Sequence, residues 1–102
     1  MSACCYIIFS QKLNHFYTGT CHENLTERIR KHNDHSYGNH RYTAAANDWS
    51  LFLEIPAHDF PHAARMERSI KSMKSSVYIQ NLKKYPELLQ KLFDKTSNWL
   101  PR

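Results

Sequence analysis

Two apolar stretches near the start of the chain predict a β-hairpin. Residues 4–9 form a continuous apolar run rich in aromatic and β-branched side chains, which is typical of a buried strand. The polar residues 11–14 fit a turn, and residues 15–21 predict a second strand that folds back on the first. Gly19 lies near the end of this second strand, where a residue without a side chain lets the backbone come close to a ligand.

A helix should follow the hairpin. Asn24 and Glu27 have the spacing of a capping box, with Asn24 as the N-cap and Glu27 reaching back to it. We therefore expect a helix over about residues 25–33. Helical spacing gives this helix one face that carries Leu25, Ile29 and His32. Arg28 borders that face.

The middle of the chain predicts a loop and then a third strand. Residues 34–48 are polar and have no clear period, so we expect a loop with a short extended piece around Tyr42. Residues 49–55 alternate in polarity, which predicts a strand that Pro56 ends. One side of that strand should carry Leu51, Leu53 and Ile55.

Three helices should form the C-terminal part. Asp59 is a good N-cap and Pro61 suits a first turn, so a helix should begin here. Its apolar stripe consists of Ala63, Met66, Ile70 and Met73. A pair of serines can cap a helix that runs to about Lys84, and Pro86 opens the next one. The buried side of this last helix should consist of Leu88, Leu89, Leu92 and Phe93.

The predicted element order is therefore β-β-α-β-α-α-α. We expect an α/β fold with a small three-stranded antiparallel sheet, in which the third strand joins the hairpin. Helices should flank the sheet, because strands this apolar cannot face water. At this length we expect one domain over residues 1–102.

The balance of charge favours an anionic partner. The chain has 14 Lys and Arg residues against 9 Asp and Glu residues, which gives a net charge of +5 with neutral histidines. An excess of this size suits nucleic acid, although a soluble protein that is merely basic would show it too.

Cysteine usage bears on compartment and metal binding. Three cysteines, two of them adjacent, give no disulfide framework, so we expect a reducing compartment: the cytoplasm, or the nucleus if the source is eukaryotic. A zinc site can be drawn from Cys21, His22, His32 and His35, but it matches no spacing with a known mechanism. No apolar run approaches the ~20 residues of a membrane span, so we expect no membrane partner.

Four short pieces of sequence together suggest phosphodiester chemistry. Tyr6 and Tyr17 stand in the two strands of the hairpin, Arg28 and His32 lie one helical turn apart, and Glu67 is flanked by cations. Hydrolysis needs an activated water, neutralisation of the phosphate oxygens and help for the leaving oxygen. A tyrosine has an ordinary pKa near 10, so it becomes a competent base only where a metal-bound water or an arginine favours the phenolate.

Each of these residues also has an ordinary structural interpretation. The two tyrosines could pack a small sheet, and an arginine beside an apolar face often only extends along it into solvent. A lone histidine on such a face can be a satisfied core residue, and Glu67 could be a surface partner of its basic neighbours.

The order and spacing of the four pieces resemble the GIY-YIG nucleases. The signature of that family is two tripeptides on a β-hairpin, then an arginine on the next helix and a glutamate on a later one. Tyr6 stands where the first tripeptide ends, and residues 17–19, Tyr-Thr-Gly, stand for the second. Residues 28–32 resemble the arginine helix and residues 67–71 the glutamate helix. Residues 41–43, Arg-Tyr-Thr, are similar to the basic loop of the small single-domain members.

The resemblance covers about residues 4–74 and leaves C-terminal helices over residues 75–95. The chain departs from the family pattern in three places. The first tripeptide reads Cys-Cys-Tyr, Thr18 replaces the usual isoleucine or valine, and Thr20 stands where some members, including the repair nuclease UvrC, carry a lysine.

The resemblance implies a metal-dependent endonuclease that cleaves DNA. Tyr17 would act as general base with Tyr6 assisting or positioning it, and Arg28 would stabilise charge in the transition state. His32 would bond a tyrosine or a phosphate, and Glu67 would hold Mg²⁺ or Mn²⁺. A lone carboxylate argues for one loosely held metal rather than two. Phosphate contacts are expected from Arg30, Lys31, His40, Arg41, Arg68 and Lys71.

Other functions stay open at this level. The same scaffold could be a non-catalytic module that binds nucleic acid or a partner, or more distantly a basic structural protein. Phosphate contacts carry little sequence information, so we expect weak sequence preference, with specificity coming from branched or structured DNA or from a protein partner.

Overall fold

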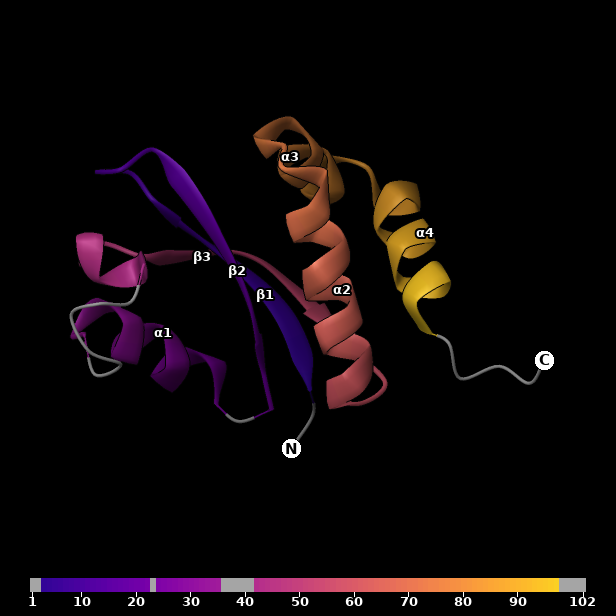
Figure 1. The fold of residues 1–102 in the computed structure, drawn as a ribbon, viewed down its shortest axis with the longest axis horizontal. Coiled ribbons are helices and arrows are strands. Elements are labelled where there is room, and N and C mark those ends of the chain that lie inside the picture. The colour runs from indigo at the N-terminus through magenta and orange to yellow at the C-terminus, as the bar shows by residue number, and fades with distance from the viewer. Residues whose placement is uncertain (1–2, 23, 36–41, 98–102) are drawn as a thin grey trace.

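The computed structural model describes residues 3–22, 24–35 and 42–97 and has the element order that the sequence predicts (Figure 1). The first elements are the strands β1 (Cys4–Ser10) and β2 (His15–Cys21). They are followed by the helix α1 (Leu25–Asn33), the 3₁₀ helix η1 (Tyr42–Ala45) and the strand β3 (Ser50–Pro56). The described chain ends with the helices α2 (Phe60–Met73), α3 (Ser76–Lys84) and α4 (Pro86–Ser97). The predicted α/β fold is confirmed.

The strand β1 is the centre of the sheet. The strand order is β2-β1-β3, and β1 pairs antiparallel with both neighbours. In the hairpin, Tyr6 lies opposite Gly19 and Ile8 lies opposite Tyr17. A strand paired on both edges and covered on both faces must be apolar throughout, which explains the continuous apolar run of β1. Within the described residues β2 is an edge strand, and this position matters for the site.

The pairing between β1 and β3 contains a β-bulge. Ile7 faces Leu53 but Ile8 faces Leu51, so Phe52 is an extra residue on β3. Both Phe52 and Leu53 pack against the same apolar cluster, and Leu51 is 47% exposed. The prediction that one side of the strand carries Leu51 together with Leu53 and Ile55 is therefore wrong, because the bulge resets the alternation between Leu51 and Leu53.

Helices cover both faces of the sheet. The helix α1 lies on one face with η1 beside it, and α2, α3 and α4 lie on the other (Figure 1). The core is divided in the same way. The cluster on the α2 side contains Cys5, Ile7, Ile55, Met66, Ile70, Leu82 and Leu92. The cluster on the α1 side contains Cys4, Tyr6, Ile8, Cys21, Ala46 and Trp49. Alternate residues of β1 thus point into two separate clusters.

Side-chain caps begin the helices α1, α2 and α3. Asn24, Asp59 and Ser75 each accept a hydrogen bond from the backbone N–H three residues later, at 3.0, 2.9 and 3.1 Å. The predicted helix starts are confirmed. Only half of the predicted capping box forms as expected, because the carboxylate of Glu27 accepts a hydrogen bond from Arg30 instead of returning to Asn24.

Two smaller predictions fail. The expected extended piece around Tyr42 is the first turn of η1. Met73, predicted in the apolar stripe of α2, is 48% exposed, because α2 ends there and Lys74 leaves the helix with a left-handed φ of 49°. None of the helices in the described ranges is long and apolar enough to span a membrane.

Candidate active site

Tyr6 lies at the centre of a buried polar chain on the α1 side of the sheet. Its side chain is fully buried, with the hydroxyl 2.8 Å from Nε2 of His32. The same hydroxyl accepts a hydrogen bond from Nε of Arg28 at 3.3 Å. Arg28 and His32 stand one helical turn apart on α1, so both reach one hydroxyl. Buried polar atoms need such partners, and here the partners are the residues that the sequence selects for chemistry.

Thr43 extends this chain. Its hydroxyl lies 2.9 Å from Nδ1 of His32, and its carbonyl accepts a hydrogen bond from Nε1 of Trp49 at 2.8 Å. The following assignment of donors and acceptors satisfies these contacts. Arg28 donates to Tyr6, the Tyr6 hydroxyl donates to Nε2, and the Nδ1–H of a neutral imidazole donates to Thr43. The sequence gives Thr43 no role, and its only signal is its place in the Arg-Tyr-Thr loop.

Gly19 leaves room for the Tyr6 ring. A Cβ built on Gly19 would lie 2.6 Å from the Tyr6 hydroxyl oxygen and 2.7 Å from Cζ. The two residues are directly opposite each other in the hairpin. The backbone at Gly19 therefore comes close to the ring of Tyr6, a catalytic candidate of the same protein, where the sequence led us to expect a ligand.

Tyr17 stands where the two faces of the sheet meet. It is half-buried on the edge strand β2, and its ring lies 5.3 Å, edge to face, from the ring of His32 on the α1 side. On the other side of the sheet, Nζ of Lys71 on α2 lies 5.5 Å from the centroid of the Tyr17 ring. Tyr17 thus touches both layers, which a residue on a central strand could not do.

Glu67 lies on α2, the helix that also carries Lys71. Its carboxylate accepts a hydrogen bond from Nζ of Lys71, one helical turn later. Burial, and after it the carboxylate of Glu67, raises the pKa of the Cys5 thiol on β1. Glu67 is therefore close to the sheet, and its side chain is only 22% exposed.

Glu67 is the residue at this place that could hold a metal. Among the described residues, no three His, Cys, Asp or Glu side chains come together as a metal-binding group. Such a site suits Mg²⁺ and Mn²⁺, because both ions prefer oxygen ligands. Mg²⁺ also keeps several waters when one carboxylate and a substrate phosphate hold it. Glu67 fits that requirement.

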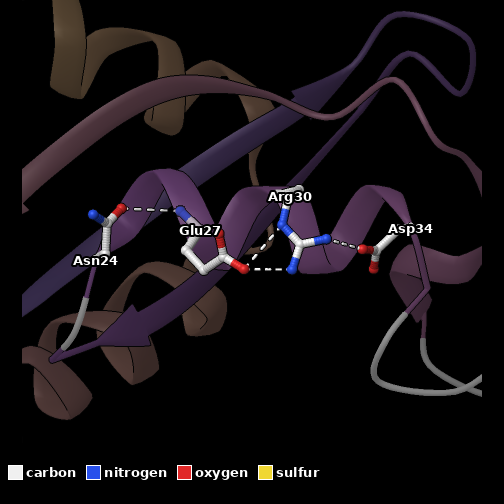
Figure 2. A network of polar contacts seen from close by, with 4 residues as sticks. All are labelled: Asn24, Glu27, Arg30 and Asp34. Carbon is white, nitrogen blue, oxygen red and sulfur yellow. Dashed lines mark hydrogen bonds and ion pairs between the residues drawn. The ribbon is translucent and has the colours of Figure 1, made fainter.

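The residues expected to bind phosphate differ in their surroundings. Figure 2 shows Arg30 on the solvent-facing side of α1, where its guanidinium pairs with Glu27 and Asp34. Lys31 is half-buried on α1, while Arg68 and Lys71 are exposed on α2. The remaining two, His40 and Arg41, lie outside the described residues. Solvent screens ion pairs as exposed as these, so a phosphate can replace the partners of Arg30.

The structure thus collects the predicted catalytic residues from four elements. Tyr6 comes from β1, Tyr17 from β2, Arg28 and His32 from α1, and Glu67 is joined to them through Lys71 on α2. These residues are far apart in the sequence. Their contacts with Tyr17 and Tyr6 at the hairpin bring them together.

The chain matches one known family over most of its length. The family model of the GIY-YIG catalytic domain matches residues 2–84 of the 102-residue chain. The matched segment includes both tripeptides, the arginine helix and the glutamate helix, and it extends through α3. No curated protein and no solved structure matches the chain significantly. With most of its length covered by the family model, the chain belongs to the GIY-YIG catalytic-domain family, a family of nucleases.

Proposed function

We propose that this protein is a metal-dependent endonuclease that hydrolyses phosphodiester bonds in DNA. One observation carries the proposal: Tyr17 sits at the sheet edge between His32 on one face and the Lys71–Glu67 pair on the other. In this proposal Tyr17 supplies a base, Lys71 a cation and Glu67 a carboxylate that act on one phosphate. The net charge of +5 provides the long-range attraction for a polyanion.

Tyr17 is proposed as the general base. It is half-buried and lines an open groove, whereas Tyr6 is fully buried behind it. A group that takes a proton from water must be accessible to that water. The ammonium of Lys71 near the Tyr17 ring would stabilise negative charge as it develops on the phenol oxygen.

Tyr6 and His32 are proposed as positioning residues. The hydroxyl of Tyr6 accepts from Nε of Arg28, which fixes the plane of the guanidinium. His32 holds that hydroxyl from the other side and packs against the Tyr17 ring. Arg28 can then present its planar donors to the phosphate oxygens without losing much freedom when the substrate binds.

Glu67 is proposed as the metal ligand, and a metal bound there would neutralise the phosphate oxygens and the leaving oxygen. Lys71 must leave the carboxylate when the metal arrives. Because this ion pair is partly exposed and contributes about 0.3–0.5 kcal/mol, the exchange costs little. Lys71 then remains close to Tyr17 and to the incoming phosphate.

A non-catalytic nucleic-acid-binding module is the second candidate, and the same ion pair favours it. A lysine that stays on Glu67 would occupy the metal ligand permanently and leave a basic surface that binds DNA without cutting it. The two candidates differ in what Glu67 does when Mg²⁺ or Mn²⁺ is supplied.

The test is cleavage of labelled duplex, single-stranded and branched DNA with and without Mg²⁺ or Mn²⁺. Tyr17→Phe should lower the cleavage rate by about two to four orders of magnitude, the usual contribution of general acid–base catalysis. Glu67→Gln should abolish cleavage at ordinary Mg²⁺ concentration and leave DNA binding at least as tight, because a negative charge is removed. Tyr85→Phe and Glu87→Gln, both at exposed positions, are matched controls that should retain full activity. Full cleavage by Glu67→Gln would refute the proposed metal ligand, and no cleavage by the parent protein would leave the binding module.

A further inference from the structure

A groove begins at Tyr17 and runs away from the site between β2 and the junction of α2 with α3. Its volume is about 620 Å³, within the range of pockets that hold a ligand of nucleotide size. Tyr17 and Lys71 line it at the site, and Asn14, Lys74 and Ile79 are among the residues that line the rest. The groove is therefore continuous with the proposed catalytic residues.

The lining of this groove is basic at its rim and apolar below. Lys71 and Lys74 contribute two ammonium groups, and within the described chain no acidic side chain lines the groove. Its apolar part consists of Phe16, Ile70 and Ile79. A cationic rim over an apolar floor fits a nucleic-acid strand, whose phosphates are anionic and whose sugars and bases present weakly polar faces.

Lys74 is placed for this contact by the backbone. It ends α2 in the left-handed conformation, with its N–H donated to the carbonyl of Lys71, and Ser75 then caps α3. This sharp change of direction puts Lys74 at the corner between the two helices. In the described part of the chain, the ion pairs involve Arg30 and Lys71 but not Lys74.

We propose that this groove binds the substrate strand on one side of the scissile phosphate, with Lys74 contacting a backbone phosphate. The inference rests on the proposed nuclease function and adds the direction in which the bound strand leaves the site. It assigns a binding role to Lys74, which the sequence patterns do not select. It also predicts that the protein recognises nucleotides unequally on the two sides of the cut.

The first test compares Lys74→Gln with the parent and with the control Lys91→Gln on the exposed side of α4. Binding is measured by fluorescence anisotropy of labelled oligonucleotides without divalent metal, between 50 and 200 mM salt. Loss of one phosphate contact lowers the salt slope by about 0.7–0.9, so the affinity advantage of the parent over Lys74→Gln should shrink about threefold across this range. Lys74→Arg should restore the parent slope, and Lys91→Gln should not change it.

The second test uses substrates shortened on either side of the cut. The parent should lose affinity and kcat/KM when one flank is removed, and Lys74→Gln should be insensitive to removal of that same flank. Equal behaviour of Lys74→Gln and the parent, in a protein that still cleaves DNA, would overturn the groove assignment and leave the nuclease proposal standing. Failure of the parent to bind or cleave any DNA would refute both. Tighter binding of a polyglutamate peptide than of DNA, lost in Lys74→Gln, would make the groove a protein-docking site and also overturn the assignment.

Discussion

Gly19→Ala tests whether the hairpin is built around the Tyr6 ring. The added Cβ would meet the Tyr6 hydroxyl oxygen at 2.6 Å, Cζ at 2.7 Å and Cε1 at 3.1 Å. The hydroxyl would have to retreat by about 0.8 Å to reach the 3.4 Å of an ordinary contact. Tyr6 is fully buried and tied to His32 and Arg28, so it cannot retreat without stretching those hydrogen bonds.

The expected loss of stability follows from two opposing terms. Overpacking of a well-filled core costs about 1–3 kcal/mol. Replacing glycine by alanine restricts the unfolded chain and returns about 0.4–1 kcal/mol, since the φ of Gly19 is not in the left-handed region. We expect a net destabilisation of about 1–2 kcal/mol, together with loss of cleavage because the Tyr6 hydroxyl has moved from its place beside Arg28.

A double-mutant cycle in urea measures this coupling. In a Tyr6→Leu background the ring atoms that clash with the new Cβ are gone, so Gly19→Ala should no longer destabilise the protein. Where Tyr6→Leu does not fold, Tyr6→Phe serves instead and should give only partial relief, because Cζ remains. An equal cost of Gly19→Ala in both backgrounds, or a stable Gly19→Ala protein with full activity, would refute the reasoning.

Three further predictions use other buried groups. Thr43→Val removes the hydroxyl that holds Nδ1 of His32, so it should lower the free energy of unfolding by about 1–3 kcal/mol and also lower kcat. Thr43→Ser keeps the hydroxyl and should retain the stability and the kcat of the parent. Chemical denaturation measures the stability and initial rates measure kcat. Burial lowers the pKa of His62, so the unfolded chain takes up a proton first and stability should fall as pH drops below about 6.5, by at most about 1.4 kcal/mol per pH unit. His62→Gln should flatten that part of the urea-midpoint profile. Burial, and then Glu54, raises the pKa of Cys4 to about 11, so a thiol reagent at pH 8 should modify Cys4 about two orders of magnitude more slowly in the native than in the unfolded protein.

The elements of this fold are well predicted because their signals are local. Asn24, Asp59 and Ser75 fix three helix starts through bonds that span three residues, and such bonds are visible as spacing in the sequence. The strands of the hairpin are equally local. The failures occur where distant contacts decide. The bulge at Phe52 depends on pairing with β1, more than 40 residues earlier in the chain, and no alternation pattern can reveal it.

The site shows the same division. The sequence selects Tyr6, Tyr17, Arg28 and Glu67 as types of residue in an order, and it cannot say which tyrosine is buried. That difference comes from strand position: β1 is covered on both faces, whereas β2 is an edge. Arg65 shows the opposite case. It is one of the cations that flank Glu67 in the sequence, but its guanidinium donates to the carbonyls at the end of α4 and so secures that helix.

The two faces of the sheet contribute different parts of the proposed chemistry, and this division has a physical reason. The α1 face holds a closed chain of hydrogen bonds through Tyr6 and His32, which resists water and fixes geometry. The α2 face holds the partly exposed pair of Glu67 and Lys71, which can exchange partners with ions from solvent. Rigid positioning favours burial, whereas a loosely held metal needs solvent access. A residue that contacts both the α1 face and the α2 face must lie at an edge of the sheet, and Tyr17 on β2 lies there.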